Sequence, residues 1–423
     1  MASMKQCCCG VDVHKSFIVA VIATLIGKEV VFTKFTRFST FTKGLREFKQ
    51  WLSYHNCFEV CMESTGKYYV PVYRIVSDET FHVDVVHPKY VKAPRGKKND
   101  KRDAKRIADM YMCDHIAEYS IIPPADILAI RDVTRYRRKT VNVMTAEKNR
   151  MSNCLTVSCI KLDEVLSDTQ GKTGQALIEQ IIKHKGCDFD PTPYIDKHVK
   201  ASMETIKMAL DGDVTPATLI KMGLIQHRLN FLDKQKTDLE SAMATLSKVF
   251  SRQLELLNSA PGVDSISAIS ILSEIGVDMQ VFGSVKRFLS WVGVVPQNNE
   301  SAGKKKTTRI GKGNTWLKPV VVQCANAAIK DKQHPEIREK YLAIKKRRGH
   351  GKAIIAIAKR LMTAIYYMLL RNQTYNPGIG KDSAPKHGKI ELEKLIEYYS
   401  SKGYTVFAKG DLPSFVAGEV LSH

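Results

Sequence analysis

The sequence predicts an α/β domain followed by a mainly helical region. Strand-like and helix-like segments alternate over about the first 115 residues, whereas the rest of the chain shows helical spacing and no obvious strand pattern. The chain has 423 residues, which exceeds the roughly 250–300 residues at which a single hydrophobic core stops growing. Two or more domains are therefore expected.

The α/β domain begins with three segments that are typical of a strand meander. Residues 7–13 form a short apolar run, residues 17–25 are apolar and β-branched, and residues 29–35 follow a turn at Gly27-Lys28. Helical spacing and further apolar runs then predict, in order, helix 41–54, strand 58–62, helix 68–77 and strand 81–86. Pro88 ends the last strand, because proline cannot continue a ladder of backbone hydrogen bonds.

Two long helices are predicted after the helix-breaking pair Pro123-Pro124. The first covers 127–155 and is strongly charged, and the second covers about 217–250. Apolar residues in the second helix follow alternating steps of four and three: Ile225, Leu229, Leu232, Leu239, Met243, Leu246 and Phe250. This period is typical of a coiled-coil seam through which chains self-associate, although an amphipathic helix packed on its own domain also fits it.

The domain organisation follows from these elements. Residues 251–372 have helical spacing without obvious strands, and Pro261-Gly262 marks a turn between two of the helices. The insert at 157–216 and the polar tail give no indication of a role. We expect an α/β domain at 1–120, a long-helix or coiled-coil region at 121–250, a helical domain at 251–375 and a tail at 376–423.

The charge balance indicates a polyanionic partner. The chain has 65 lysines and arginines against 43 aspartates and glutamates, a formal net charge of +22, and cations that contact phosphates release counterions. Nucleic acid is the first expectation and an anionic membrane the second. No apolar run approaches the roughly 20 residues that span a bilayer, and the start of the chain lacks the apolar stretch of a signal peptide. We therefore expect a cytoplasmic protein.

The ten cysteines favour neither a disulfide scaffold nor a zinc site. Cys7, Cys8 and Cys9 are adjacent at the start of an apolar strand, where reduced core residues are expected. The spacings of the remaining cysteines do not give the paired C-x-x-C elements that a structural zinc site needs.

Four acids mark the candidate site. Asp12 in G-V-D-V-H-K and Glu63 in M-E-S-T-G stand where two apolar strands end, and Asp100 and Asp103 open a helix after a third strand. Acids that end central strands project from the same edge of a sheet, and i,i+3 spacing puts the other two on one helix face. Such a cluster of carboxylates repels itself unless it binds a hard divalent cation, and Mg²⁺ fits.

The same helix start carries cations that suit the flanking phosphates of a nucleic acid. Lys97, Lys98, Lys101 and Arg102 surround the two aspartates. Taken alone, Asp100 and Asp103 are better explained as a helix N-cap and an acid that complements the helix dipole. Asp12 is harder to explain structurally, because an acid within an apolar strand is costly unless it is paired or bound to a metal.

These motifs resemble a known family. G-V-D-V-H-K, M-E-S-T-G-K-Y and K-N-D-K-R-D-A, in this order, are similar to the amino-terminal domain of the DEDD transposases of bacterial insertion sequences, a family that also resembles the pilin-gene invertase. The resemblance implies a fold like that of the Holliday-junction resolvase RuvC, an RNase H-like domain. It places the metal-binding acids on Asp12, Glu63, Asp100 and Asp103.

The second half resembles the carboxy-terminal transposase domain of the same family. The matching segments include S-A-P-G-V-D, F-L-S-W-V-G-V-V-P-Q, E-S-A-G-K-K-K-T-T-R-I-G-K-G-N and R-R-G-H-G-K-A. The resemblance implies a serine nucleophile at Ser301 and guidance by a structured noncoding RNA of the element. The residues themselves show a hydroxyl in a glycine-rich loop with cations suited to phosphates: Lys304, Lys305, Lys306, Arg309 and Lys312.

The sequence therefore predicts a DNA transposase that cleaves and rejoins strands through Ser301, with Mg²⁺ at the four acids. DNA, a guide RNA and further copies of the chain, as a dimer or tetramer, are the expected partners. Two other readings remain open. One is a metal-dependent junction endonuclease that uses water and never rejoins strands, and the other is a nucleic-acid-binding protein without catalysis.

Overall fold

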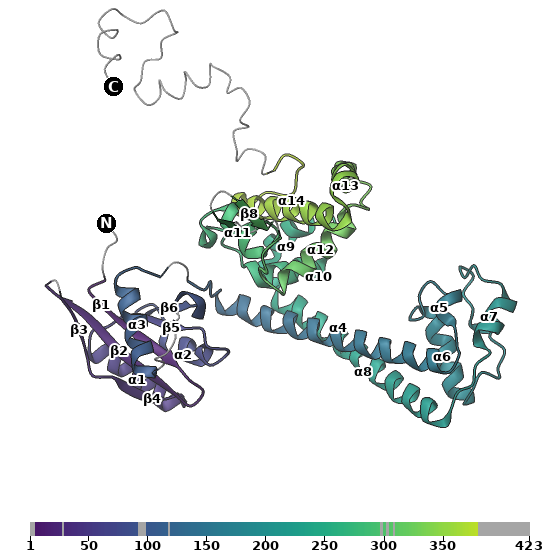
Figure 1. Cartoon of the computed structure of the whole chain (residues 1–423), viewed down its shortest axis with the longest axis horizontal. Helices are drawn as coiled ribbons and strands as arrows, with labels where there is room; N and C mark the ends of the chain where they lie inside the picture. Colours follow the sequence, from purple (N-terminus) through teal and green to yellow (C-terminus); the bar gives the residue numbers. More distant parts are fainter. Residues whose placement is uncertain are drawn as a thin grey trace, which may run out of the picture. The chain divides into compact units, whose positions relative to one another are not determined.

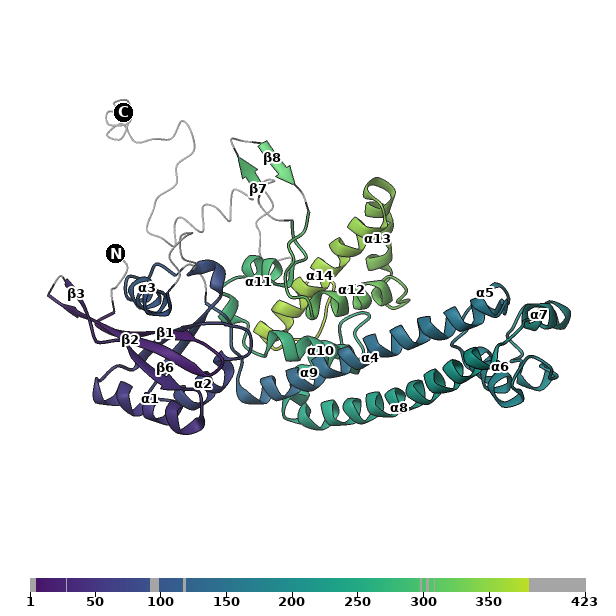
Figure 2. The same cartoon turned by 60° about the horizontal axis from the view of Figure 1, so that its bottom comes forward.

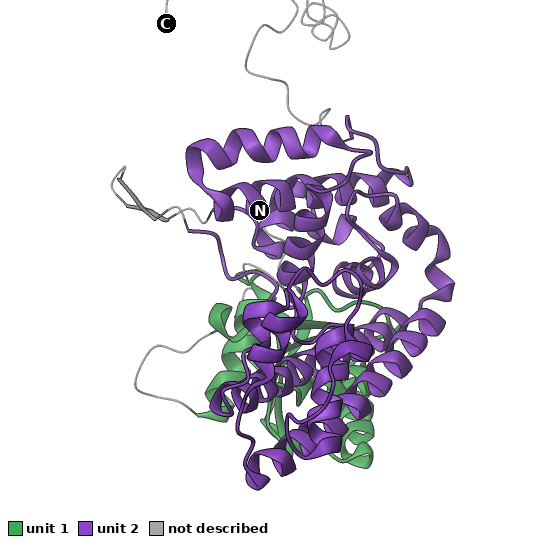
Figure 3. Ribbon diagram, turned by 90° about the vertical axis from the view of Figure 1, so that its right-hand side faces the viewer, with its two compact units in different colours: residues 1–124 green, residues 125–423 purple. Residues whose placement is uncertain are grey.

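The computed structural model describes residues 5–27, 29–91, 99–116, 119–296, 299–301, 304–307 and 309–379, with the backbone alone described from 299 to 307. The chain divides into two compact units, residues 1–124 and residues 125–423, which Figure 3 colours green and purple.

The first unit is built on a mixed sheet. Its strand order is β3-β2-β1-β5-β6, with β4 also paired to β2. β1 runs antiparallel to β2, whereas β5 lies parallel to both β1 and β6. The strands are β1 (Cys7–Val13), β2 (Phe17–Ile26), β3 (Glu29–Phe32), β4 (Thr36–Ser39), β5 (Glu59–Glu63) and β6 (His82–Val86).

Helices cover both faces of this sheet. Alternate residues of β1 and β5 pack with buried residues of α1 (Thr42–Tyr54) and α2 (Tyr69–Val76) on one face. The intervening residues pack against α3 (Asp100–Met112) on the other. Because strand side chains alternate between faces, the continuous apolar runs of β1 and β5 supply buried residues to both layers. The expected meander is confirmed, with the difference that residues 29–39 form two short strands, β3 and β4, rather than one.

Gly10 is what lets α3 lie close to β1. A Cβ at Gly10 would lie 2.3 Å from the carbonyl oxygen of Ala104 and 2.4 Å from the backbone nitrogen of Ala108, far inside contact distance. Any other residue would push the helix away from the strand. The glycine two residues before Asp12 therefore sets how close the start of α3 comes to the end of β1.

The second unit begins with an antiparallel helix pair. α4 (Ala125–Val157) and α8 (Pro216–Leu246) lie side by side in both views (Figures 1 and 2). Arg137 donates to Glu240, and Glu147 pairs with Arg228. Residue numbers therefore increase along α4 in the direction in which they decrease along α8, so the two helices are antiparallel. The insert between them folds into α5 (Leu162–Val165), α6 (Lys172–His184) and α7 (Met203–Leu210), which share an apolar core with the ends of α4 and α8.

The predicted coiled-coil seam is largely used inside the chain. Ile225 and Leu229 lie in the core that α8 shares with α4 and the insert, and Met243 packs against Ile130 of α4. Leu232 is also buried. The heptad pattern is thus accounted for by an intrachain partner helix, which is the alternative that the sequence left open. Self-association stays a prediction.

The rest of the second unit is helical, with one exception. The helices are α9 (Ser251–Asn258), α10 (Ser265–Ile275), α11 (Val285–Val292), α12 (Leu317–Ala328), α13 (Pro335–Arg348) and α14 (His350–Arg371). The expectation of no strands here is wrong, because β7 (Asn299–Ser301) and β8 (Lys304–Thr307) form an antiparallel pair. Short 3-10 helices complete the described elements: Pro88–Tyr90, Thr192–Tyr194, Lys248–Phe250 and Gln280–Phe282.

α14 is the central core helix of this region. It is long and apolar enough to cross a membrane by length and composition, but 61% of its most apolar window is buried inside the protein. Its contacts with α9, α11, α12 and α13 explain that apolar surface. The helix therefore has the environment of a core helix in a folded domain.

Candidate functional site

Strand register brings two of the four predicted acids together. Val11 of β1 pairs with Met62 of β5 in a parallel ladder, so Asp12 and Glu63 are the next residues along neighbouring strands. Cys8 and Cys61 face α3, and alternation from these positions puts both acids on the face that α3 covers. The carboxyl ends of two adjacent parallel strands thus present their acids at one edge, as the sequence predicts.

A histidine joins the cluster. His14 Nε2 lies 3.1 Å from Asp12 Oδ2 and 3.5 Å from Asp100 Oδ2. Donor atoms of Asp12, His14 and Asp100 all lie within 4.8 Å of one another. Two neighbouring ligands of an octahedral ion with bonds of about 2.1 Å are about 3 Å apart. The spacing of these three side chains is therefore suited to holding one divalent cation.

Sequence reasoning did not identify His14 as a site residue. The available signal was the spacing D-V-H, because residues two apart along a strand face the same side. His14 stands just past β1, and its backbone nitrogen donates to the carbonyl oxygen of Phe17 in the turn to β2. That turn holds the imidazole over the end of the strand.

The structure corrects the helix-cap interpretation of Asp100. The N-cap of α3 is Asn99, whose side chain accepts a hydrogen bond from the backbone nitrogen of Lys101 at 3.0 Å. Asp100 is the first helical residue, and its carboxylate points to His14. Because Asn99 does the capping, Asp100 is available to the cluster.

Asp103 lies in a different environment. It is buried, and Arg106 one turn later donates to its carboxylate while also donating to the carbonyl oxygen of Val91 at 2.8 Å. Arg106 therefore neutralises Asp103 and ties α3 to the chain after β6. Glu63 is half-buried. Of the four predicted acids, Asp12 and Asp100 belong to the compact group with His14.

The charge state of Asp12 reflects its crowded position. Burial raises the pKa of the Asp12 carboxyl above its ordinary value, His14 lowers it, and the charges of Asp100 and Asp103 raise it further. The net shift is upward. Without an added cation, the site thus resists full ionisation, which is the behaviour expected where several carboxylates converge.

The predicted basic residues fall into three groups. Lys101 and Arg102 are exposed on the first turn of α3, next to the acids, and Arg309 and Lys312 are exposed in the second unit. Lys97 and Lys98 lie outside the described residues, and so do the side chains of Ser301, Lys304, Lys305 and Lys306. The backbone of Ser301 ends β7 and pairs with Lys304 of β8, in place of the glycine-rich loop that was expected.

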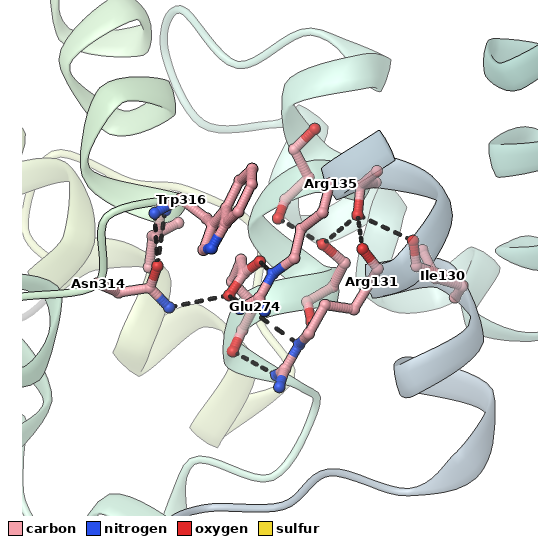
Figure 4. A network of polar contacts seen from close by, with 10 residues as sticks. Ile130, Arg131, Arg135, Glu274, Asn314 and Trp316 are labelled. Atoms are coloured by element: carbon pink, nitrogen blue, oxygen red, sulfur yellow. Dashed lines mark hydrogen bonds and ion pairs between the residues drawn. The ribbon is translucent and has the colours of Figure 1, made fainter. Parts of the chain in front are cut away.

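The segment after β8 is anchored by a buried acid, as Figure 4 shows. Asn314 donates from its side chain to Glu274 of α10 at 2.9 Å, and its oxygen accepts from the backbone nitrogens of Trp316 and Leu317 at the start of α12. Arg135 of α4 forms two parallel bonds to the Glu274 carboxylate, at 2.7 and 2.8 Å. Glu274 therefore links α4, α10 and the segment that leads from β8 to α12.

A pocket of about 370 Å³ lies beside this network. Arg138 and Lys236 line it, but so do Glu240, Asp264 and Glu274, and Arg135 and Arg137 are already paired with acids. The positive and negative charges of the lining nearly balance, so the pocket has little net charge that would favour an anionic ligand.

The fold and the site define a class of protein, in which an α/β unit with a carboxylate cluster at a sheet edge is joined to a strongly basic helical unit. Two family models match: a transposase model of the DEDD IS110 type over residues 9–160 and the transposase IS116/IS110/IS902 family over residues 254–342. The chain belongs to this family of insertion-sequence transposases.

Relatives carry matching names. A transposase for insertion sequence element IS1111A from Coxiella burnetii is 22% identical over 313 residues, which cover 72% of this chain and 76% of the relative. A probable family 20 transposase from Pseudomonas aeruginosa is 22% identical over 306 residues, 70% of this chain and 79% of the relative. Both similarities extend across most of the two chains.

Proposed function

We propose that this protein is a DNA transposase that cleaves and rejoins strands at a divalent-metal site formed by Asp12, Glu63, Asp100 and Asp103. The observation that carries the proposal is the meeting of Asp12 and Asp100 with His14 at the end of β1, at distances that suit ligands of one ion. The neighbouring β5 adds Glu63 on the same sheet face. Membership of a transposase family supports DNA as the substrate.

Mg²⁺ is the proposed ion, because carboxylate oxygens are its preferred ligands. A bound ion would polarise the phosphoryl oxygens of the scissile group and stabilise attacking and leaving oxygens. The imidazole nitrogen of His14 adds a donor that Mn²⁺ accepts more readily than Mg²⁺ does. Mn²⁺ should therefore support the reaction too, and it is the better spectroscopic probe.

The topology of the first unit supports an RNase H-like fold. Three antiparallel strands, β1 to β3, are extended by β5 and β6, both parallel to β1, and helices lie on both faces. In such a sheet the carboxyl end of the central strand is the natural place for a metal-binding acid, and Asp12 is at that position. The other parts of the proposed mechanism, which are the serine nucleophile and the guide RNA, follow from the family resemblance.

Ser301 is the proposed nucleophile. Its hydroxyl oxygen would form an ester bond with the scissile phosphorus as the bond to the leaving strand breaks, while the serine proton is lost and the leaving oxygen gains one. The number of phosphate ester bonds is unchanged, so the strand can be transferred to a new hydroxyl without an external energy source. Lys304, Lys305, Lys306, Arg309 and Lys312 would hold the adjoining phosphates.

The proposed partners are donor and target DNA and a structured noncoding guide RNA. The net charge of +22 supports a polyanionic partner, and the RNA rests on the family resemblance alone. We further propose that the protein works in the cytoplasm as a homo-oligomer.

Substitution of Ser301 tests the rejoining mechanism. Ser301→Ala should abolish cleavage and strand transfer while nucleic-acid binding persists, and the wild type should form a protein–DNA adduct that survives denaturing gels. Thr307→Ala and Thr308→Ala are matched controls that should still form the adduct. Wild-type cleavage rates in Ser301→Ala with Mg²⁺ would contradict the proposal.

The second candidate function is a metal-dependent endonuclease that hydrolyses DNA junctions with water. It is favoured by one observation, since the whole acid cluster lies within residues 1–124. Metal-dependent cleavage of DNA by the wild type without a protein–DNA adduct would favour this endonuclease function over the transposase function.

A further inference from the structure

The junction of α13 and α14 carries a dense group of cations that the proposed chemistry does not use. The last turn of α13 holds Lys345, Lys346, Arg347 and Arg348, and Gly349, His350, Gly351 and Lys352 follow at the start of α14. All eight residues are exposed. Residues 345–352 are called the α13–α14 corner below, and the two helices meet there in Figures 1 and 2.

The sequence that follows Glu339 of α13, as far as Ile379, contains no acid that could offset this charge. From Lys340 to Ile379 the sequence contains nine lysines and arginines and no aspartate or glutamate. α14 begins without an acid in its first turn and without a capping side chain, so the positive end of its dipole adds to the same field. A stretch that carries charge of one sign repels itself, and the binding of an anion would relieve this repulsion.

The corner cations also differ from other arginines of this unit. Arg135, Arg137 and Arg150 each pair with a glutamate. Among the described residues, by contrast, Lys346, Arg347, Arg348 and Lys352 form no ion pair or side-chain hydrogen bond. Their charges are therefore available to a partner.

The corner is presented on a fixed support. The Tyr341 hydroxyl lies 2.8 Å from His350 Nδ1, which joins the last turns of α13 to the first turn of α14. Tyr341 and Ile337 of α13 are buried, and α14 is a core helix. The long cationic side chains of the corner therefore extend from a backbone that the core of the domain holds in place.

We propose that the α13–α14 corner binds the phosphodiester backbone of a nucleic acid, without reading its bases and without a metal ion. This inference rests on the proposed function for the presence of nucleic acid. Lysine and arginine contacts to phosphates supply affinity, whereas base reading needs side chains placed in a groove or stacked on bases. An anionic membrane is less suited, because the apolar face of α14 is buried rather than available for insertion.

The test is a binding titration with EDTA present. Fluorescence anisotropy would follow labelled double-stranded DNA and labelled single-stranded RNA from about 50 to 200 mM salt. The corner variant is Lys345→Gln, Lys346→Gln, Arg347→Gln and Arg348→Gln. A matched control removes the same charge from exposed lysines of the insert, with Lys183→Gln, Lys197→Gln, Lys200→Gln and Lys207→Gln.

The corner variant should bind one or both nucleic acids at least about tenfold more weakly, with a salt slope smaller by about three to four, since each lost phosphate contact lowers the slope by about one. The control should change much less. Arg347→Lys with Arg348→Lys keeps the charge and should behave as wild type, which separates charge from folding.

Three results would overturn the inference. Equal losses in the corner and control variants would show general attraction and no site at the corner. Loss of binding to anionic vesicles with unchanged nucleic-acid affinity would assign the corner to lipid. Failure of the wild type to bind either nucleic acid would remove the proposed function as well, whereas the first two results leave it intact.

Discussion

Two buried carboxylates in this protein have opposite surroundings. Asp12 of the first unit is 8% exposed and Glu274 of the second is 5% exposed. Glu274 receives two bonds from Arg135 and one from Asn314. Asp12 faces His14 and lies in the field of two further carboxylates, Asp100 and Asp103.

The difference supports the proposal that Asp12 has a functional role, whereas Glu274 has a structural one. A buried charge is tolerated when cations and hydrogen bonds satisfy it, and Glu274 meets that condition with groups of its own unit. The Asp12 cluster gathers negative charge that its own surroundings only partly offset. Such an arrangement suits a cation from outside, which would complete the charge balance.

The largest expected effect comes from removing the charge of Asp12. Asp12→Asn keeps the shape of the side chain, so the fold should persist while metal-dependent cleavage falls about a thousandfold, the rate equivalent of losing several kcal/mol of transition-state stabilisation. Cleavage assays per folded molecule would measure it. Unchanged activity per folded molecule would show that Asp12, like Glu274, is a structural acid.

Removing Glu274 should act on stability instead. Glu274→Ala leaves Arg135 without its partner and frees the segment at Asn314, at a cost of about 3–5 kcal/mol to the second unit. Glu179→Ala, an exposed acid on α6, is the control and should cost less than about 0.5 kcal/mol. Denaturant unfolding measures both changes in the free energy of unfolding. If Glu274→Ala costs as little as Glu179→Ala, Glu274 does not have the structural role that distinguishes it from Asp12.

The faces of α8 provide a smaller test. Leu232 is buried within the chain, whereas Leu224 and Phe231 are 68% and 64% exposed. Leu232→Lys should therefore destabilise the helix pair. Leu224→Lys with Phe231→Lys should leave stability nearly unchanged and lower the oligomer mass in light scattering. If the mass is unaffected, self-association does not use this face.

The smallest effect is a pH dependence of the metal-free protein. The folded pKa of Asp12 lies above its unfolded value, so its contribution to stability is fully present below the unfolded pKa of about 3.9. That contribution is lost as pH rises through the folded pKa. In EDTA, the free energy of unfolding of the wild type should fall relative to that of Asp12→Asn from about pH 4 upward. If the two free energies change in parallel with pH, the pKa of Asp12 is not raised in the folded protein.

The sequence predicted the first unit well because its signals are local. Apolar runs marked β1, β5 and β6, and the rule that strand ends share an edge placed Asp12 beside Glu63. It did not distinguish Asn99 from Asp100 as the cap of α3, because both residue types cap helices and only the backbone decides.

Other features depend on the tertiary structure. The heptad pattern of α8 was recognised, but a sequence period does not say whether the covering helix comes from the same chain. β7 and β8 are three and four residues long and rich in charge, so they lack the apolar alternation that marks a strand. The pairing of Glu274 with Arg135 joins residues 139 positions apart and has no local signal.

Thermal unfolding with and without millimolar Mn²⁺, in the absence of nucleic acid, tests the central claim most directly. If the Asp12 cluster is a cation site, the wild-type midpoint should rise with Mn²⁺, since an ion that binds only the folded state stabilises it. Asp12→Asn should start at or above the ion-free wild type, because repulsion is relieved, and should not respond to the ion. A lower midpoint for Asp12→Asn without ion, or an equal Mn²⁺ response in both proteins, would contradict the account.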